Sequence, residues 1–400
     1  MTSLSLVTAG APAVDWDAAA GQVAEALRAD AAARDHAGLA PRRELELLRA
    51  SGLLALLNPP AHGGGGGSFG DAFRAVRRIA RVDTSVAQLL SYHYLHLINA
   101  LWRAGAGQGE QLSRASVSGR WFWGGASNPR DPESQLTADG PDFRLNGRKT
   151  FASNASLADR ITLRAQIGGG FAVLTVPGDR AGVTHGNDWD AFGQRLTESG
   201  TIAFDNVRIG RGEILGEAEP GSAAPLSPRV SLVVPLHQLL IVNFYVGTAE
   251  GALAEANAYL RSTARPWQAS GVSEARQDPY VLEHYGELDV QARAAAALAD
   301  VAGAALEGAI ARGHDLTVPE RHAAAAAIYA AKVQSSRAAL DITSRIFELM
   351  GARATATSYG FDRFWRNIRT HTLHDPVFYK AREVGNYALN GTITATPLYS

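Results

Sequence analysis

Hydrophobic and polar positions divide this chain into three regions. In the first, apolar residues recur at the three- and four-residue spacing of amphipathic helices, and Asp83 or Thr84 is placed to cap the last of them. In the second, short β-branched and aromatic runs alternate with Gly, Pro, Asn and Asp, as strands and turns do. In the third, long helices return. The first region predicts helices over residues 15–37, 41–50, 69–81 and 84–103.

The second region, residues 120–216, predicts a β domain. Within it, Asn146–Gly147 is the dipeptide most typical of a two-residue hairpin turn, so we expect the chain to reverse there. The expected strands lie within residues 121–127, 142–153, 159–167, 170–178 and 200–209.

The third region predicts four helices, over residues 230–261, 279–312, 319–350 and 377–389. The middle two are Ala-rich and apolar on more than one face, which is typical of helices buried in a bundle or a subunit interface. We therefore predict an α+β protein with an N-terminal helical domain (1–119), a central β-barrel domain (120–217) and a C-terminal four-helix bundle (218–400). We also expect a homo-oligomer.

Three segments are expected to lack regular structure. Residues 61–70 contain five consecutive glycines, which have no side chains to pack, and predict a flexible loop. No Gly-Lys-Ser/Thr follows, so this run is not a nucleotide P-loop. Residues 216–228 are predicted to be a linker, and the first dozen residues a loose tail.

Composition and charge exclude several classes of protein. Lys and Arg total 38 against 39 Asp and Glu, so the basic face that nucleic-acid binding needs is not expected. No run reaches the roughly 18 uninterrupted apolar residues of a membrane span. The N-terminus lacks the basic and apolar regions of a secretory signal, and we expect a cytoplasmic protein without membrane or nucleic-acid partners. The absence of Cys excludes disulfides, thiolate metal sites and cysteine nucleophiles.

The segment FDRFWRNIRTHTLHDPVFYK, residues 361–380, carries the most chemical information. It places three arginines, two histidines and two aspartates among aromatic residues, and buried charge is costly unless it is paired or used. Arginine suits a phosphate or carboxylate, and histidine exchanges protons near neutral pH. The segment predicts an active site that holds an anionic cofactor. The alternative is that His371 and His374 bond helix-end carbonyls while the arginines pair with neighbouring acids.

The order of helical domain, β domain and helical bundle resembles the acyl-CoA dehydrogenase superfamily over nearly the whole chain. The motifs that carry the resemblance are WFWGGASNP, NGRKTFASNASLAD, GQRLTESGTIAFDNVRI with a following ILG, and RFWRNIRTHTLHDP. Within the superfamily, RPW, DPY and the closing RTHTLHDP are similar to the two-component flavin-dependent monooxygenases, the branch typified by dibenzothiophene monooxygenase.

This resemblance implies a flavin site. Ser127 and Asn128 would lie along the pyrimidine edge of the flavin, and Ser153 would lie near its N5. An arginine at the position of Arg265 reaches cofactor phosphate in the family, sometimes across a subunit boundary. The residues that the resemblance places at the cofactor are Trp123, Ser127, Asn128, Phe151, Ser153, Arg265, Trp267 and Arg369.

The chain also departs from true dehydrogenases, which usually carry a Thr-Glu-Pro-like triplet where this chain has Ser127-Asn128-Pro129. Many of them place a catalytic glutamate near the closing segment. The nearest acid here is Asp375, which is one methylene shorter and is followed by Pro376. These departures argue against α,β-dehydrogenation. Asp375 would instead cap the next helix or orient His374.

The resemblance therefore implies an FMNH2-dependent monooxygenase, with FAD possible, that works through a C4a-hydroperoxyflavin. Such chemistry needs a dry pocket and one or two hydrogen-bond donors. His93 is expected to face the flavin, and His371 or His374 to act as the acid or base. The expected catalytic residues are His93, Ser153, His371, His374 and Asp375.

The expected substrate is a small apolar compound oxidised at sulfur, or less favourably at nitrogen or carbon. No dinucleotide-binding fingerprint is present, so a separate NAD(P)H-dependent reductase would supply the reduced flavin to what we expect to be a homotetramer.

Three alternatives stay open at this stage. The first is an FAD-dependent acyl-CoA dehydrogenase, and the second is a non-catalytic member of the fold that binds no flavin. The third is an iron or zinc enzyme with ligands drawn from His93, His96, His371, His374 and Asp375. No HExxH motif and no paired bundle glutamates accompany these histidines, so we predict no metal.

Overall fold

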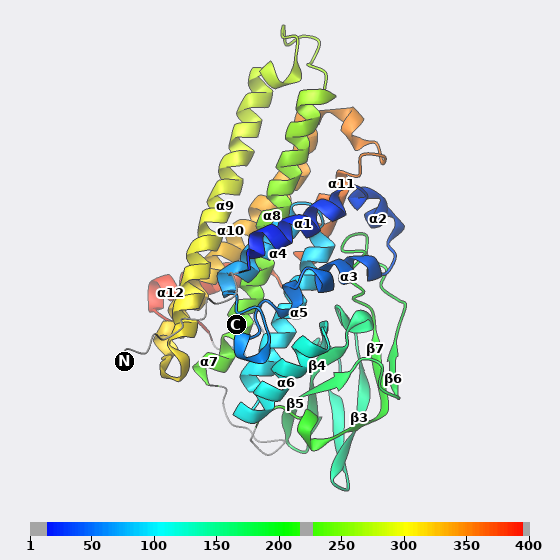
Figure 1. Cartoon of the computed structure of the whole chain (residues 1–400). Helices are drawn as coiled ribbons and strands as arrows, with labels where there is room; N and C mark the ends of the chain where they lie inside the picture. Colours follow the sequence, from blue (N-terminus) through cyan, green and yellow to red (C-terminus); the bar gives the residue numbers. More distant parts are fainter. Residues whose placement is uncertain (1–13, 217–226, 395–400) are drawn as a thin grey trace, which may run out of the picture.

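The computed structural model describes residues 14–216 and 227–394, and the predicted tail and most of the predicted linker lie outside these ranges. Helices, a sheet and then long helices follow one another along the chain (Figure 1). This is the predicted α+β order of a helical region, a sheet region and a helical bundle. The domain boundaries at residues 119 and 217 stay predictions.

The N-terminal helices are α1 (Trp16–Arg28), α2 (Ala31–Ala37), α3 (Arg42–Ala50), α4 (Phe69–Ala80), α5 (Thr84–Arg103) and α6 (Ala106–Ser118). The single helix predicted over residues 15–37 is therefore two helices. Asp83 caps α5, because its side chain accepts a hydrogen bond of 3.0 Å from the N–H of Val86, as predicted.

The glycine run before α4 is packed, and the prediction of a flexible loop was wrong. The N–H of Gly65 donates to the carbonyl of Ala55 and that of Gly67 to the carbonyl of Leu56, each at 2.9 Å. A Cβ atom on Gly65 would lie 2.4 Å from the Trp16 ring. Glycine is needed here because the backbone comes too close to its neighbours to leave room for a side chain.

Within the described residues, seven strands form one mixed sheet in the order β1-β4-β2-β3-β7-β6, with β5 also paired to β4. Both β1 and β2 run parallel to β4, whereas β3 is antiparallel to β2 and β7. The strands are β1 (Trp123–Ala126), β2 (Ser134–Asp139), β3 (Asp142–Lys149), β4 (Arg160–Ile167), β5 (Gly170–Pro177), β6 (Val183–His185) and β7 (Ile202–Ile209).

The hairpin predicted at Asn146–Gly147 is wrong. These residues lie inside β3, where the pairing with β7 shifts register between Leu145 and Gly147. The chain reverses instead at Gly140, which has a positive φ of 60° and joins β2 to β3. The pattern misled because β2 was not predicted, and a glycine that forms a bulge has the same local signature as one that forms a turn.

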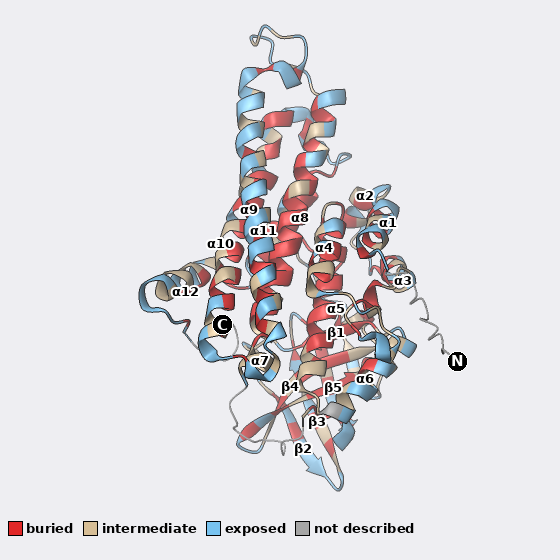
Figure 2. Cartoon of the chain, turned by 60° about the vertical axis from the view of Figure 1, so that its left-hand side comes forward, coloured by how far each residue is buried: buried red, intermediate tan, exposed pale blue. Residues whose placement is uncertain are grey.

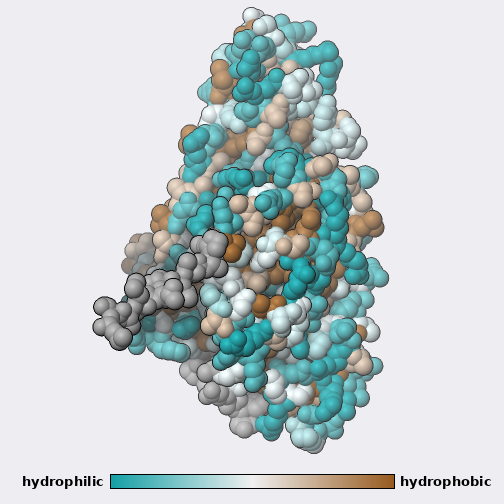
Figure 3. Space-filling view, in the orientation of Figure 1, coloured by the Kyte–Doolittle hydropathy of each residue, from teal (hydrophilic) through white to brown (hydrophobic). Residues whose placement is uncertain are grey.

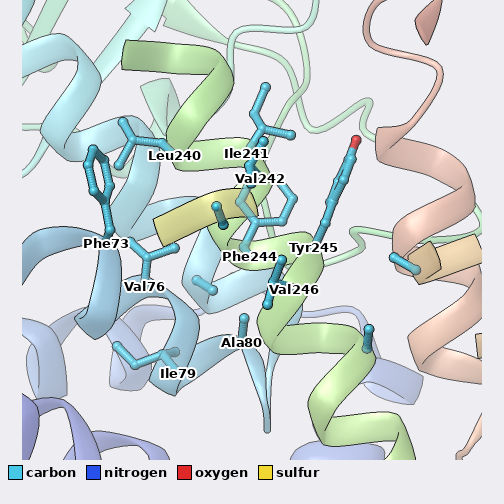
Figure 4. Packing of buried hydrophobic residues seen from close by; sticks show 14 of the residues in the cluster. Phe73, Val76, Ile79, Ala80, Leu240, Ile241, Val242, Phe244, Tyr245 and Val246 are labelled. Atoms are coloured by element: carbon cyan, nitrogen blue, oxygen red, sulfur yellow. The ribbon is translucent and has the colours of Figure 1, made fainter. Parts of the chain in front are cut away.

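The C-terminal region consists of α7 (Pro228–Ser231), α8 (Val233–Ser262), α9 (Pro279–Ala311), α10 (Val318–Met350), α11 (Asp362–His371) and α12 (Val377–Asn390). Helix α11 was not predicted, whereas the four predicted helices begin and end within three residues of α8, α9, α10 and α12. Helix α8 packs on α9, α10, α4 and α5, so it joins the bundle to the N-terminal helices. Figure 4 shows Phe73 and Val76 of α4 against the apolar face of α8, with Tyr245 on the side of α8 turned away from them.

Burial differs between the two most apolar helices. Helix α8 is mostly buried, whereas α9 keeps much of its length exposed (Figure 2). By length and composition alone, Pro228–Ser262 and Pro279–Ala311 would each be apolar enough to cross a membrane, a test that core helices also pass. On the face in Figure 3, hydrophobic residues are scattered among hydrophilic ones.

Candidate active site

His371, the last residue of α11, lies between two tyrosines. Its Nδ1 is 2.8 Å from the hydroxyl of Tyr245 on α8, and its Nε2 is 3.2 Å from the hydroxyl of Tyr92 on α5. The ring is buried, and burial lowers the pKa of His371 well below its ordinary value. His371 is therefore neutral at pH 7, with one ring nitrogen as donor and the other as acceptor.

Asp375 lies on the other side of the same cluster. Its carboxylate is 3.1 Å from Nδ1 of His374, 3.9 Å from Nζ of Lys332 and 3.8 Å from Nζ of Lys380. Burial opposes ionisation of Asp375, but these three neighbours outweigh burial and hold the pKa of the carboxyl below its usual range. Asp375 is therefore an ionised group that fixes His374.

Lys332 on α10 is a buried cation of the site. Its Nζ is 3.5 Å from the Tyr245 hydroxyl, and burial lowers the pKa of Lys332 to about 8 although Asp375 opposes this shift. Sequence reasoning missed Lys332, Tyr245 and Tyr92. A signal for Lys332 existed, since only three of the 38 basic residues are lysines. All three are buried: Lys149, Lys332 and Lys380.

Two more imidazoles surround Tyr92. The ring of His237 on α8 lies 5.1 Å from that of Tyr92 and 5.2 Å from that of His374, and His96 lies 6.2 Å from Tyr92. Nε2 of His237 and Nδ1 of His96 are buried without a hydrogen-bond partner within the described residues. Burial lowers the pKa of His96 to about 3. Orphaned buried nitrogens indicate a place where a ligand or water bonds.

His93 does not face this cluster with a ring nitrogen. Its Nε2 donates to the carbonyl of Leu54 at 2.8 Å, and its Nδ1 accepts from the N–H of Trp123 at 3.1 Å. Both nitrogens thus bond main-chain groups, and they tie α5 to the start of the sheet. This geometry gives His93 a structural role in place of the predicted catalytic one, and it is His96, three residues on, that reaches the site.

The two segments predicted to lie along a flavin are joined to each other. Asn128 donates from Nδ2 to the Thr150 hydroxyl at 3.0 Å, and the N–H of Gly125 reaches the carbonyl of Ser153 at 3.5 Å. Ser153 is buried, and its hydroxyl lies 2.7 Å from that of Ser199. Ser127 and Phe151 are exposed beside them.

His96 connects this surface to the histidine cluster. A Cβ atom on Gly125 would lie 1.9 Å from Cε1 of His96, so the imidazole lies flat against β1. The candidate site therefore runs from the β1 and β3 ends, past His96, to Tyr92 and His371. A flavin ring fits this arrangement, because one wall offers Ser127, Asn128 and the exposed Phe151, and the other offers imidazole nitrogens with no hydrogen-bond partner within the described residues.

Other predicted cofactor residues lie elsewhere. Trp123 is fully buried in a core cluster, and its Nε1 donates to Ser116, so it has no surface for a cofactor. Arg265 and Trp267 are exposed in the loop between α8 and α9, at the end of the bundle far from the sheet (Figure 1). Within one chain they do not meet the cluster.

The three arginines of α11 divide into two kinds. Arg363 pairs with Glu255. Arg366 pairs with Asp35 and Asp362. These two arginines therefore pair with acids, as in the alternative to a cofactor-binding role. Arg369 is half-buried, and its side chain makes no hydrogen bond or ion pair within the part of the chain described. Its charge acts on the nearby Tyr245, where it opposes the increase in pKa that burial causes. Arg369 is thus the arginine available to an anion.

No group of three or more His, Asp or Glu side chains within residues 14–216 and 227–394 has the arrangement of a metal site. Two of the five proposed ligands have other partners, since His93 bonds main-chain groups and Asp375 lies within 4 Å of two lysines.

Comparison with known proteins agrees with this fold. Sequence models of the acyl-CoA dehydrogenase N-terminal, middle and C-terminal domains match residues 16–116, 124–207 and 239–377. The chain belongs to the acyl-CoA dehydrogenase family.

Particular relatives are more specific than the family. A probable FMNH2-dependent monooxygenase, SfnC, of Pseudomonas putida is 40% identical over 385 residues, covering 95% of each chain. Dibenzothiophene monooxygenase of Mycolicibacterium goodii is 42% identical over 371 residues, covering 89% of each chain.

Solved structures agree with these relatives. Methanesulfinate monooxygenase MsuC from Pseudomonas fluorescens superposes with a TM-score of 0.92 at 38% identity, covering 97% of this chain and 100% of that one. FMN-bound TdsC from Paenibacillus sp. A11-2 superposes with a TM-score of 0.93 at 36% identity, with the same coverage.

Proposed function

We propose that this protein is an FMNH2-dependent monooxygenase that oxidises a small apolar compound at sulfur. Reduced FMN, when bound, supplies the electrons that activate oxygen. The relatives with this activity in their names align over nearly the full length of the chain, and the sulfur compounds in their names include dibenzothiophene and methanesulfinate. FMN in a solved relative of the same fold supports FMN as the cofactor.

One observation carries the choice between oxygenase and dehydrogenase. A dehydrogenase needs a base that removes an α-proton, and a general base works best when its pKa lies near the operating pH. Asp375 is the nearest acid in the closing segment, and Lys332, His374 and Lys380 hold its pKa far below that range. Asp375 is therefore too weak a base for α-proton removal, whereas neutral imidazoles and tyrosine hydroxyls suit the binding of oxygen-containing groups.

The chain offers specific contacts to FMN. Ser127 and Asn128 would bind the pyrimidine edge of the ring, Ser153 would lie near its N5, and Phe151 would cover it. Arg369 would bind the phosphate, because it is half-buried and not neutralised by an acid. His374 and His96 would hold reactants and exclude water at the inner end of the site.

The proposal includes a cytoplasmic homotetramer served by a separate NAD(P)H-dependent flavin reductase. Support for the assembly comes from the outer face of α9, which exposes Tyr280, Leu282, Val290 and Val301. A partner subunit on this face would also cover the α8–α9 loop, and Arg265 and Trp267 would then contribute to a neighbouring site. Light scattering on purified protein tests this, and a monomer of 42.3 kDa would contradict it.

The activity is tested by supplying reduced FMN and oxygen with dibenzothiophene or methanesulfinate and identifying the product by mass spectrometry. We expect an oxygenated sulfur product with FMNH2 and none when FMNH2 is omitted. Reduction of bound FAD by an acyl-CoA, without sulfur oxidation, would support the dehydrogenase instead.

A further inference from the structure

A continuous line of side-chain contacts joins Lys332 to Tyr92. It runs from Nζ of Lys332 to the Tyr245 hydroxyl at 3.5 Å, from that hydroxyl to Nδ1 of His371 at 2.8 Å, and from Nε2 of His371 to the Tyr92 hydroxyl at 3.2 Å. The four residues come from α10, α8, α11 and α5, and each of them is buried. The line therefore crosses the protein interior between four helices.

The chemistry of its first member gives this line a direction. A charged lysine only donates hydrogen bonds, so the Tyr245 hydroxyl accepts from Lys332 and turns its own hydrogen toward Nδ1 of His371. Neutral His371 then carries its hydrogen on Nε2 and donates it to Tyr92. The Tyr92 hydroxyl accepts this bond, so its own hydrogen points away from His371. The rings of His96 and His237 lie 6.2 and 5.1 Å from that of Tyr92.

When Lys332 is neutral, the donor and the acceptor exchange roles in every hydrogen bond of the line. Its Nζ then has a lone pair that accepts from the Tyr245 hydroxyl, His371 donates from Nδ1, and the Tyr92 hydroxyl turns its hydrogen back to Nε2. The two directions differ by a single proton on Lys332.

We propose that Lys332, Tyr245, His371 and Tyr92 form a proton relay, and that the charge of Lys332 decides whether Tyr92 donates into the active site. Tyr92 is the residue that touches the reactants, and the other three act through it. This inference rests on the proposed function, since it concerns a proton that oxygen transfer consumes.

The proposed step moves one proton from Lys332 to the bound reactants, and its atoms and charges balance. One N–H bond of Lys332 breaks and one O–H bond forms on an oxygen atom of the bound reactants. Between them, Tyr245, His371 and Tyr92 each lose one hydrogen and gain one, and no electrons are exchanged. The relay is left in its reversed direction until Lys332 takes a proton from solvent, past Asp375 and the partly exposed His374.

The surroundings of Lys332 keep both of its states accessible. It faces Asp375 and Lys380 beyond α11, His371 on α11, and Tyr245 and His237 on α8. Asp375 raises the pKa of Lys332 and Lys380 lowers it. Burial, the largest effect, brings that pKa to about 8. An arginine could not serve, because it does not release its proton in proteins. The chain uses Arg for all but three of its 38 basic residues, and one of the three exceptions stands here.

The direction of the relay is measurable without cofactor. In full-length protein labelled with 15N-histidine, long-range NMR distinguishes protonated from unprotonated ring nitrogens, and the signals lost in His371→Asn identify His371. We expect the hydrogen on Nε2 at about pH 7 and on Nδ1 at about pH 9.5, since the second value lies above the lowered pKa of Lys332. The same tautomer at both pH values would overturn the proposal.

Two variants locate the cause of the switch. Lys332→Arg keeps the charge at both pH values, so His371 should keep its hydrogen on Nε2. If Lys332→Arg does not fold, Tyr245→Phe breaks the line after Lys332, and the tautomer should no longer follow pH. Tyr94→Phe is the control, because it removes a buried hydroxyl of α5 that bonds Leu53 outside the line and should leave the switch intact. A switch that persists in Lys332→Arg or Tyr245→Phe would refute the relay.

Turnover provides a second readout. Loss of a proton donor costs about 10²-fold or more in rate, so Tyr92→Phe should lower the rate of product formation by that factor. The wild-type rate should fall above pH 8. The rate of Tyr245→Phe should be low and should not change with pH. A tautomer switch without sulfur oxidation would leave the relay standing and defeat the proposed function. Sulfur oxidation without a tautomer switch would support the proposed function and refute the relay.

Discussion

The carboxylate of Asp375 lies 3.1 Å from Nδ1 of His374 and within 4 Å of two buried lysines, Lys332 and Lys380. The acid nearest the place of a dehydrogenase base is therefore engaged in holding an imidazole. Its negative charge directs the Nδ1 hydrogen of His374 to itself and leaves Nε2 on the other side of the ring. Asp375 therefore orients His374 and does not act as the base that removes an α-proton.

Replacing His374 should uncouple flavin oxidation from product formation. His374→Ala removes an imidazole that packs between His237 and His371, and the gap admits water to the reactants. We expect several-fold more peroxide released per reduced FMN consumed, at nearly unchanged stability. Peroxide assays on His374→Ala and on His314→Ala, which alters an exposed histidine, make the comparison; equal coupling in the two variants would remove His374 from the mechanism.

Arg369 should contribute directly to cofactor affinity. A hydrogen bond to a charged group is worth about 1.5–3 kcal/mol, so Arg369→Ala should weaken FMN binding by roughly 10- to 100-fold. Fluorescence titration with FMN measures the dissociation constant. Arg42→Ala, on an exposed arginine of α3, serves as the control. An unchanged constant for Arg369→Ala would exclude the phosphate contact.

Acid should destabilise the fold through His93. Burial lowers the pKa of His93 to about 4, whereas the unfolded chain binds that proton near 6.5. Unfolded protein therefore binds more protons between these values, and stability falls as pH drops from 6.5 to 4, by about 3 kcal/mol for this residue. Urea denaturation of wild type and of His93→Gln should give a shallower pH dependence for the variant. Parallel curves would show that His93 does not carry this effect.

The contact of Gly125 with His96 predicts a sharp difference between two glycines. A methyl group at Gly125 would overlap Cε1 of His96, so Gly125→Ala should displace the imidazole and impair FMN binding and turnover. A methyl group at Gly286 on α9 would enter open space, with no packing neighbour within 4 Å, and Gly286→Ala should stabilise the helix by up to about 1 kcal/mol. Crystal structures and thermal melts of both variants check this, and normal FMN affinity in Gly125→Ala would contradict it.

Hydrophobic periodicity predicted the C-terminal helices well, because the apolar residues of a packing face recur at short spacing within the helix itself. The ends of α9 and α10 agree with the pattern to within one residue. Local signals failed where partners are distant in sequence. The register shift at Gly147 depends on β7, and the packing of Gly65 depends on Trp16.

The site was predictable only in part for the same reason. The closing segment supplied His371, His374 and Asp375, whereas their neighbours Tyr92 and Lys332 come from other helices and carry no motif. Helix spacing could not choose between His93 and His96, because both lie on one side of α5 and only the fold shows which of them bonds Leu54.

The most direct test of the proposed function uses isotopic oxygen. Protein, photoreduced FMN and dibenzothiophene or methanesulfinate are mixed under 18O2, and the product is analysed by mass spectrometry. A monooxygenase places one 18O atom from O2 on sulfur for each turnover. Reoxidation of FMN at the rate of the free cofactor, with no labelled product, would contradict the account.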